Sequence, residues 1–422
     1  MPRAFVRITG LSLLFSATLS HAAPLALEEV LVEARKVAED SQTVPISMSV
    51  VTPEKVESLN AFDFTELDRI VPSLQLGQNS PASATLKIRN VGPDFFALAF
   101  PAAVAVYVDG VPQAQPGSVF STMLDIERVE VLNGPQGTLY GKNAPAGLIS
   151  IYTVKPDTQE RSGYITSSYS SWETWNNQLA INVPLVEDKL ALRVAGMYAE
   201  SEGYMNNAIP TVDEGNGKEH RGVRAKLLWQ PSTDLEVQFS YYAVDIYTED
   251  NGGGHEGQVP DDRGETMFFS NYDEYEVFKG VPSFSDTKVQ EFNLNIGWAL
   301  ESVNLSFLAQ YQDLDIFQQQ DNSNWRTVPP PDVARDFLEF NPVAWSTEIR
   351  ADGVLGDRLN YVSGVIYSED DTDTINSINS INILGGSTTE AFGVYTNWTY
   401  RINDQWDTSL GGRWSRVSYN AT

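Results

Sequence analysis

Few side chains in this sequence have both the type and the spacing that chemistry at a site would need. The run 137–142 is similar to a phosphate-binding loop, in which backbone N–H groups hold phosphate oxygens and a lysine contacts the terminal phosphate. However, the second glycine and the lysine follow the first glycine one residue too early, and Asn143 stands where that loop has a magnesium-binding serine or threonine. We therefore interpret Gly137 and Gly141 as residues of tight turns.

The remaining reactive residue types also favour structural interpretations. Asp109 could be a catalytic carboxylate, but an Asp-Gly pair between two apolar strands is typical of a hairpin turn. The sequence contains no cysteine, which excludes disulfides, thiolate metal sites and cysteine nucleophiles. Only His220 and His255 lie beyond residue 22, and two histidines on separate loops do not make a histidine-rich metal site. We expect no enzyme, no metal site and no cofactor.

The charge of the chain limits its partners. With 56 acidic and 28 basic residues the formal net charge is −28, so we expect no nucleic-acid partner, because phosphate polyanions are bound by clustered positive charge. The loop 245–286 alone holds eleven acidic residues and two basic ones. A solvated acidic loop is the simpler interpretation, and a lid that grips a substrate or calcium is the alternative. Its aromatic residues are better candidates for ligand contact, among them Phe268, Phe269 and Tyr272.

The first residues are typical of a secretory signal peptide. Arg3 and Arg7 precede the apolar run 8–19, and small residues at Ser20 and Ala22 offer a cleavage site after Ala22. A membrane anchor is the alternative, but the run is too short for one and no stop-transfer pattern follows it. We expect an exported protein.

From Ser162 onward the sequence has the period of two that is typical of β-strands. The run 292–298 places apolar residues on one face and small or polar residues on the other. Short turns are expected at 184–188, 231–234, 301–303, 353–357 and 403–405, and long polar loops at 201–219, 246–287, 317–342 and 369–387. This rhythm is typical of an outer-membrane barrel, in which the short connections all face one compartment. A soluble sandwich or propeller explains the alternation but not the rhythm.

Two further features fit a barrel. Tryptophans lie beside the short turns, where an aromatic girdle would meet the bilayer interface: Trp229, Trp298, Trp398 and Trp406. The pattern predicts about eleven strands, and a single-chain bacterial barrel closes with an even number. We therefore expect either a C-terminally truncated piece of a longer protein or strands supplied from elsewhere.

The part before the strands contains a more specific order of elements. It starts with an extended segment, 27–36, in which Val30, Val32 and Ala34 share a face, so that it could add to a partner's sheet as an edge strand. Further elements follow: a helix over 65–72 that ends at Pro72, a strand over 86–92, an apolar strand over 104–111 turned by Asp-Gly, and the block 125–144.

This order resembles the plug domain of TonB-dependent outer-membrane receptors over residues 27–156, and the block 125–144 is the most specific part of the match. The resemblance implies a mainly β protein: a globular α+β plug domain followed by an antiparallel transmembrane β-barrel, which has about 22 strands in plugged transporters and ends here at about eleven. The segment 27–34 is then similar to the TonB box, with Glu28, Glu29, Val30, Leu31 and Val32 as the TonB-binding residues. The plug residues with a structural role are Arg89, Asp109, Gly110, Glu130, Gly134, Gly137 and Gly141.

The chain departs from the family pattern at three places, one of which is 146–150, where the family more usually has a double glycine. The family usually has Arg-Gly where this chain has Arg89-Asn90, and a basic residue where it has Asn133. We expect Arg89 to be an ion-pair partner of the barrel wall, because a charge on a buried plug strand needs a partner; a ligand contact is the alternative.

The sequence thus predicts four regions: a signal peptide (1–22), a flexible segment with the TonB box (23–43), a plug domain (44–158) and a partial transmembrane barrel (159–422). The resemblance implies TonB-dependent active transport of a scarce ligand, a ferric siderophore first of all, in the outer membrane of a Gram-negative bacterium. Its partners would be TonB with the inner-membrane energy-coupling complex, outer-membrane lipid, and the ferric siderophore or a similar small ligand. Phe95 and Phe96 join the three loop aromatics as candidate ligand contacts. A passive pore or a surface binding protein is the alternative, and the segment at Leu27 discriminates, because a passive pore has no use for it.

Overall fold

The structure is a computed structural model, and it describes residues 31–59, 64–77, 85–93, 102–114, 123–207, 215–249, 259–260, 266–267, 276–277, 282–321, 335–378 and 381–421. The expected signal peptide lies outside these residues. Among them, no helix is long and apolar enough to cross a membrane.

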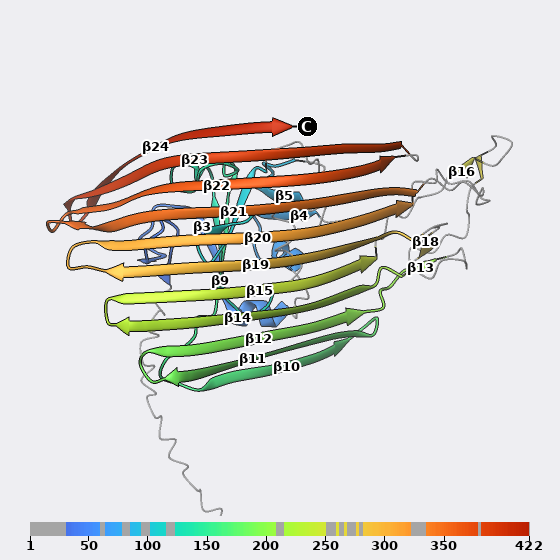
Figure 1. Ribbon diagram of the computed structural model, residues 1–422, viewed down its shortest axis with the longest axis horizontal. Helices are drawn as coiled ribbons and strands as arrows, with labels where there is room; N and C mark the ends of the chain where they lie inside the picture. Colours follow the sequence, from blue (N-terminus) through green and yellow to red (C-terminus); the bar gives the residue numbers. More distant parts are fainter. Residues whose placement is uncertain are drawn as a thin grey trace, which may run out of the picture.

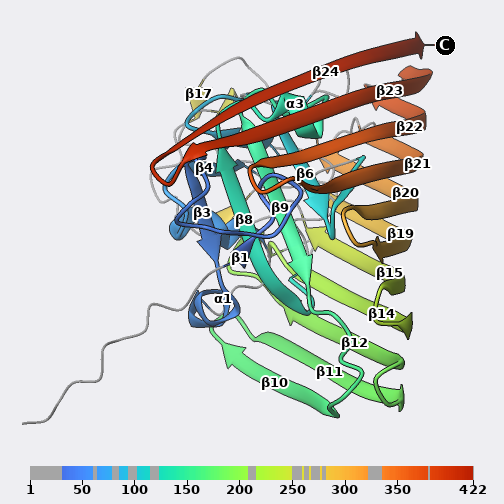
Figure 2. The same ribbon diagram turned by 90° about the vertical axis from the view of Figure 1, so that its left-hand side faces the viewer.

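One large antiparallel sheet contains eleven strands that follow the order of the chain (Figure 1). The strands are β10 (Ser162–Ser170), β11 (Thr174–Val186), β12 (Leu190–Ser201), β14 (Lys218–Ser232), β15 (Leu235–Glu249), β19 (Phe284–Ala299), β20 (Asn304–Asp321), β21 (Arg335–Leu355), β22 (Leu359–Ile378), β23 (Ile381–Asn403) and β24 (Trp406–Ala421). The sheet curves, and the remaining domain lies on its concave side (Figure 2). The expectation of an antiparallel sheet of about eleven strands is confirmed.

The polarity of the two faces of this sheet is the opposite of that in a water-soluble protein. On β15 the buried positions Gln238 and Ser240 face the concave side, whereas Phe239 between them is 44% exposed. The four tryptophans beside the short turns are between 40% and 66% exposed. A sheet that exposes apolar residues and buries polar ones fits lipid outside and a hydrated lumen inside.

The connections confirm the short turns and correct one long loop. Turns of two to four residues join the strands at one end of the sheet, and the stretches after β12, β15 and β20 are long. The expected loop 369–387 is wrong, because β22 and β23 run through it as one paired hairpin in which Ile378 faces Ile381. The parts of β22 next to this hairpin end carry acidic residues and threonines at consecutive positions, from Glu369 to Thr374, so the alternation of apolar and polar residues is lost there.

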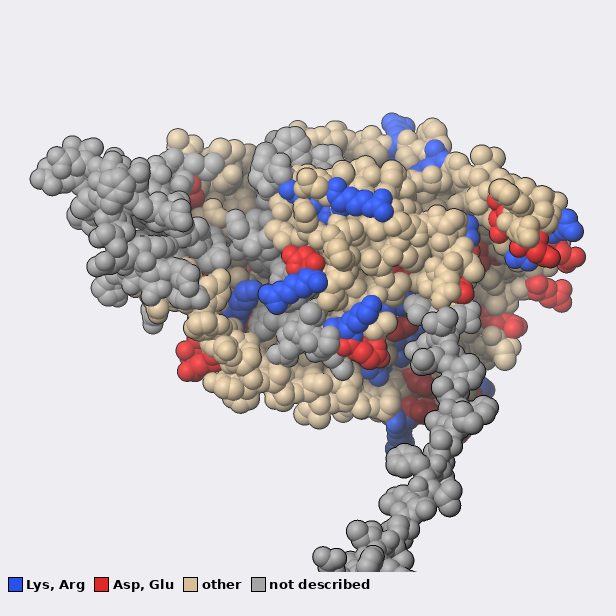
Figure 3. Space-filling view, turned by 180° about the vertical axis from the view of Figure 1, so that it is seen from behind, with Lys and Arg blue, Asp and Glu red and all other residues tan. Residues whose placement is uncertain are grey.

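The second domain is built on a five-stranded sheet of order β3-β8-β9-β6-β7. Its strands are β3 (Met48–Val51), β8 (Ile126–Asn133), β9 (Gly147–Thr153), β6 (Val104–Val108) and β7 (Val111–Pro112). A separate pair, β4 (Leu74–Gly77) with β5 (Thr85–Ile88), and the helices α1 (Pro53–Leu59), η1 (Phe64–Arg69) and α3 (Gly137–Tyr140) complete it. The helix expected over 65–72 is a 3-10 helix that ends earlier. Charged residues are scattered over the face of the molecule that Figure 3 presents.

Three further pairs of short strands lie outside these sheets. They are β1 (Leu31–Val32) with β2 (Glu39–Asp40), β13 (Asn206–Asn207) with β18 (Glu276–Val277), and β16 (Val259–Pro260) with β17 (Thr266–Met267).

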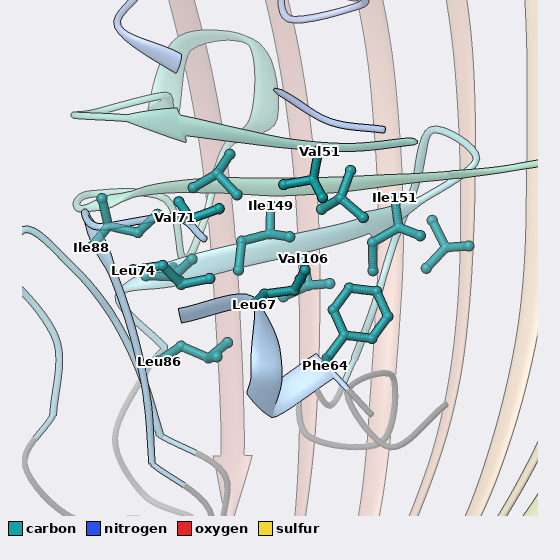
Figure 4. Close-up of a cluster of buried hydrophobic side chains, with 14 of the residues drawn as sticks. Val51, Phe64, Leu67, Val71, Leu74, Leu86, Ile88, Val106, Ile149 and Ile151 are labelled. Carbon is teal, nitrogen blue, oxygen red and sulfur yellow. The ribbon is translucent and has the colours of Figure 1, made fainter. Parts of the chain in front are cut away.

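An apolar core holds the second domain together. Phe64 and Leu67 of η1 are fully buried against Ile149 and Ile151 of β9 (Figure 4). The Asp109-Gly110 turn joins β6 to β7 as expected, with φ of 47° and 83°, the left-handed values that a two-residue hairpin of this kind requires. This turn points the hairpin at the wall of the large sheet.

Candidate functional site

The first described residues form a small hairpin inside the concave side of the large sheet. β1 pairs with β2, with Leu31 opposite Asp40 and Val32 opposite Glu39. The backbone N–H of Lys36 donates to the carbonyl of Glu33 at 2.8 Å, and Lys36 takes a φ of 63°. The hairpin therefore turns back at Lys36. We call residues 31–40 the N-terminal hairpin.

Apolar packing and side-chain hydrogen bonds fix one face of the N-terminal hairpin to the second domain, which we call the plug. Val32 and Ala34 are buried in a cluster that contains Tyr140 and Leu148. The hydroxyl of Tyr140 lies 3.2 Å from the carbonyl oxygen of Glu33 and 3.3 Å from that of Ala34, which accept its hydrogen bond. Leu31 remains 54% exposed. The hairpin is thus held from Val32 onward, with Leu31 accessible.

A buried carboxylate fixes the hairpin backbone. Both oxygens of Glu130, on β8, accept the backbone N–H of Glu33 at 3.1 and 3.2 Å. Arg128 donates to Glu130 at 2.9 Å and stacks over the ring of Tyr152 at 3.7 Å. Burial raises the pKa of Glu130, although Arg128 opposes this effect. The expected structural residue Glu130 therefore contacts Glu33, within the expected TonB box 27–34.

Lys36 fixes the tip of the hairpin to the wall of the large sheet. Its Nζ lies 2.7 and 2.8 Å from the two carboxylate oxygens of Glu348, on β21, and each side chain is only 4% exposed. The hydroxyl of Tyr395, on β23, also donates to Glu348. Burial lowers the pKa of Lys36, and the carboxylate of Glu348 opposes this effect. The ammonium and the carboxylate are both desolvated, so each depends on the other.

Two more buried ion pairs fix the plug to the first strands of the large sheet. Asp125 accepts two hydrogen bonds from Arg193, on β12, each 2.7 Å long. Asp109 lies 2.9 Å from Nζ of Lys226, on β14, and also accepts bonds from Thr153. Burial alone would raise the pKa of Asp109, but Lys226 and Thr153 outweigh it and lower that pKa. Buried ion pairs therefore attach the plug and the hairpin to the wall at three separate places.

Comparison with known proteins places these contacts in a family. The family described as TonB-dependent Receptor Plug Domain matches residues 40–148. The pesticin receptor of Yersinia pestis is 26% identical over 384 residues, which cover 88% of this chain and 53% of that protein. The structure of the ferric yersiniabactin uptake receptor from Yersinia pestis has a TM-score of 0.72 at 19% identity, covering 89% of this chain and 61% of that one. The chain resembles the TonB-dependent receptors, and its residues 40–148 belong to their plug-domain family.

Other members of the family agree with this assignment. The ferripyoverdine receptor of the outer membrane of Pseudomonas aeruginosa has a TM-score of 0.76 at 15% identity, covering 93% of this chain and 55% of that one. The ferric enterobactin receptor of the same species is 26% identical over 270 residues, 53% of this chain and 35% of that protein. These relatives are receptors rather than enzymes. The chain spans about half the length of the pesticin receptors that it matches. Like these receptors, it is an outer-membrane protein of a Gram-negative bacterium.

The structure corrects two expectations about the plug of this receptor. Arg89 is not a buried partner of the barrel wall: it is exposed, and its guanidinium donates to the hydroxyl of Ser47 on the plug itself. The reason is that β5 ends at Ile88, so Arg89 stands on the following turn. The segment 23–43 is also not free along its whole length, because residues from Val32 onward are packed and hydrogen-bonded.

The other expected residues are divided between described and undescribed parts of the chain. Gly134 and Gly141 have φ of 92° and 80°, and Gly137 begins α3. Leu31 and Val32 form β1. Eight of the expected contact residues lie outside the described residues: Glu28, Glu29, Val30, Phe95, Phe96, Phe268, Phe269 and Tyr272. Their roles remain predictions. Within the described part of the chain, no group of three or more metal-binding side chains comes together.

The charged residues of the wall that meet the plug were not predicted from the sequence. Lys226, Arg193 and Glu348 all stand at inward positions of strands that otherwise alternate. An isolated charge among buried positions of a strand is a signal that a partner faces it. The sequence does not say which plug residue that partner is.

Proposed function

We infer that the complete protein takes up a scarce ligand across the outer membrane, and that this uptake depends on TonB. The observation that carries this proposal is the position of Leu31 and Val32, a short strand that starts outside the packed plug and continues directly into it. A strand in this place offers backbone groups to a partner sheet on one side and a mechanical connection to the plug on the other.

The alternative, a passive pore, is less compatible with the contacts of the plug. Three buried charge pairs and an apolar core hold the plug in the lumen, and a buried pair is costly to break. Opening such a plug requires work. Uptake through this protein should therefore stop when the energy source is removed.

We propose a ferric siderophore as the ligand, since several relatives are receptors for such chelates by name. The proposed contacts are aromatic side chains of the upper plug and the long loop, because organic chelators offer apolar and aromatic surface. They are Phe95, Phe96, Phe268, Phe269 and Tyr272.

The test of the ligand uses a deletion strain that carries the complete gene. It is grown without free iron on single siderophores, and cobalamin and oligosaccharide uptake are measured alongside. Rescue by one siderophore that fails after Phe95→Ala or Phe268→Ala supports both the ligand class and the site. Dependence of cobalamin or sugar uptake on the gene, with no iron chelate transported, would refute the ligand while leaving active transport in place.

The test of coupling is a substitution of Leu31, which is exposed and loses little packing. Leu31→Pro removes a backbone donor and cannot continue a strand ladder, so we expect uptake to stop while ligand still binds at the cell surface. Leu31→Ala keeps the backbone donor and should keep uptake. Val30→Pro and Val32→Pro should also stop uptake, but Val32 is buried in the cluster with Tyr140, so Val32→Pro changes packing as well as the strand. Normal uptake in Leu31→Pro would indicate passive flow.

A further inference from the structure

The surroundings of Lys36 have the composition of a binding site for an alkylammonium ion. Its Nζ lies 4.8 Å from the ring centroid of Tyr395, 5.3 Å from that of Tyr140 and 5.9 Å from that of Tyr107. Aromatic faces within about 6 Å attract a cation, and cages of several such faces recognise ammonium groups. The carboxylate of Glu348 supplies the opposite charge. Three rings and one carboxylate therefore surround a single ammonium.

The parts of this cage come from two different bodies. Tyr107 lies on β6 and Tyr140 on α3, both in the plug, whereas Glu348 and Tyr395 lie on β21 and β23 of the wall. The ammonium enters from a third part, the tip of the N-terminal hairpin. One side chain thus ties the hairpin to the plug and to the wall at once.

The carboxylate of the cage keeps a second cation nearby. Nη1 of Arg350 lies 4.0 Å from Glu348, and the guanidinium of Arg413 lies over Tyr395 at 5.7 Å. After departure of Lys36, Glu348 would still face a positive charge, so the cost of leaving it unpaired is reduced. Such a pair can be broken and re-formed.

We propose that Glu348, Tyr107, Tyr140 and Tyr395 form a primary-ammonium site that Lys36 occupies, and that this occupancy keeps the N-terminal hairpin folded against the plug. The consequence for coupling rests on the proposed function: a pull on β1 reaches the cage within four residues, and withdrawal of Lys36 releases residues 31–40. Lys36 acts as a positioning residue, since it fixes the tip of a hairpin that Glu130 and Tyr140 hold at Glu33.

The site is accessible enough for a small amine. A cavity of about 60 Å³ adjoins the cage and is lined by Tyr107, Tyr140 and Arg413 among others. Truncation of Lys36 to alanine removes three methylene groups and the ammonium. Propylammonium has the same four heavy atoms and should fill the space that they leave.

The experiment measures how fast a buried position of the hairpin reacts with a thiol reagent. The substitution Ala34→Cys is made in the full-length protein, from which any other cysteine has been removed. Ala34 is 1% exposed. The rate at which a maleimide labels the new cysteine is then followed over time. We expect Lys36→Ala, Lys36→Met and Glu348→Gln each to accelerate labelling roughly tenfold or more, because each removes the ion pair that fixes the tip of the hairpin to the wall. Propylammonium should slow the labelling of Lys36→Ala again. Propan-1-ol, a neutral molecule of the same size, should not.

The matched control is Lys142→Ala. Lys142 also pairs with the wall, at 2.7 Å from Asp370, but its side chain is 34% exposed and lies outside the cage. Labelling at position 34 should be unchanged in this variant. Equal acceleration by Lys142→Ala, equal rescue by propan-1-ol, or unchanged labelling in both Lys36 variants would each overturn the proposal. Lys36→Met keeps the length of the chain and serves if Lys36→Ala does not fold.

The labelling needs no transport, so it separates the two proposals. The expected labelling pattern in a protein that takes up no ligand refutes the proposed function alone. If the parent protein takes up its ligand but the Lys36 variants are labelled at the same rate as the parent, only the ammonium site is refuted.

Discussion

Asp109 has two roles that depend on different atoms. Its backbone occupies the first central position of the β6–β7 turn, and its carboxylate pairs with Lys226 of the wall. The first role follows from the Asp-Gly pair in the sequence. The second does not, because it needs a lysine 117 positions later in the chain to face inward at the matching height.

We predict that Asp109→Asn lowers the free energy of plug unfolding by about 3 kcal/mol at pH 7, because Lys226 is left buried without its counter-charge. The folded state lowers the pKa of Asp109 below 3.8, so its stabilisation is present above that pH and is lost as the pH falls through the folded value. Calorimetry in detergent should therefore show a difference between the two proteins that shrinks below about pH 4. The exposed Asp234→Asn should change little, and a pH-independent difference would contradict the assignment.

Lys36 shows where prediction from residues stops. The sequence places it at the end of an extended segment with no sign that it is buried. Its partner Glu348 lies 312 positions away, and the two meet only because the hairpin turns back inside the curved sheet. The alternation of residue types predicts the extended segment, but it does not predict the direction in which the chain continues after it.

At the scale of elements, the turn after β5 shows how the chain accommodates a departure from the family pattern. Arg89 and Asn90 have φ of 52° and 61°, and Ile88 and Val91 are bridged across them. Asparagine tolerates this left-handed conformation better than most residues.

We predict that Asn90→Ala lowers the free energy of plug unfolding by about 1 kcal/mol, since alanine is strained at this φ. Asn90→Gly should not lower it, because glycine adopts the conformation without strain. Denaturant unfolding of the two variants against the parent protein provides the measurement. Equal stability of the alanine and glycine variants would show that the turn conformation contributes nothing.

The strands themselves were predictable to the point where they leave the bilayer. Within the apolar band, alternation is forced by lipid on one side and lumen on the other. Beyond it, in the Asp- and Thr-rich part of β22 and β23, water contacts both faces and the alternation disappears. The sequence pattern therefore predicts a loop where the structure has a paired hairpin.

At the scale of the whole molecule, the location in a membrane follows from the polarity of the sheet. The buried face carries residues such as Lys226, Gln238 and Asn293, and the outward face carries large apolar residues. This inversion, together with the number of strands, was available from the sequence. The attachment of the plug to the wall could not be predicted from the sequence, because it depends on which plug residues and which wall residues lie at the same height in the lumen.

We predict that Phe239→Arg, which places a charge on the lipid side, destabilises the sheet by about 2–4 kcal/mol, whereas Trp229→Arg, nearer the interface, costs only about 0–1 kcal/mol. The full-length protein is heated in detergent to a series of temperatures and then run on a gel. The readout is the temperature at which the band of the folded protein disappears. A smaller effect for Phe239→Arg than for Trp229→Arg would place the lipid contact elsewhere on the strand.

The length of the β22–β23 hairpin has a consequence for large binding partners. About ten residues suffice for a tilted strand to cross the hydrocarbon layer, so the remaining ten or so of β22 extend for roughly 34 Å along the strand. At a tilt of about 45° this length raises the tip of the hairpin by roughly 24 Å above the layer. The backbone groups of the hairpin are already paired with each other. A bulky protein that approached the cell surface would therefore meet a stiff post rather than a flexible tether, and docking on it would cost little conformational entropy.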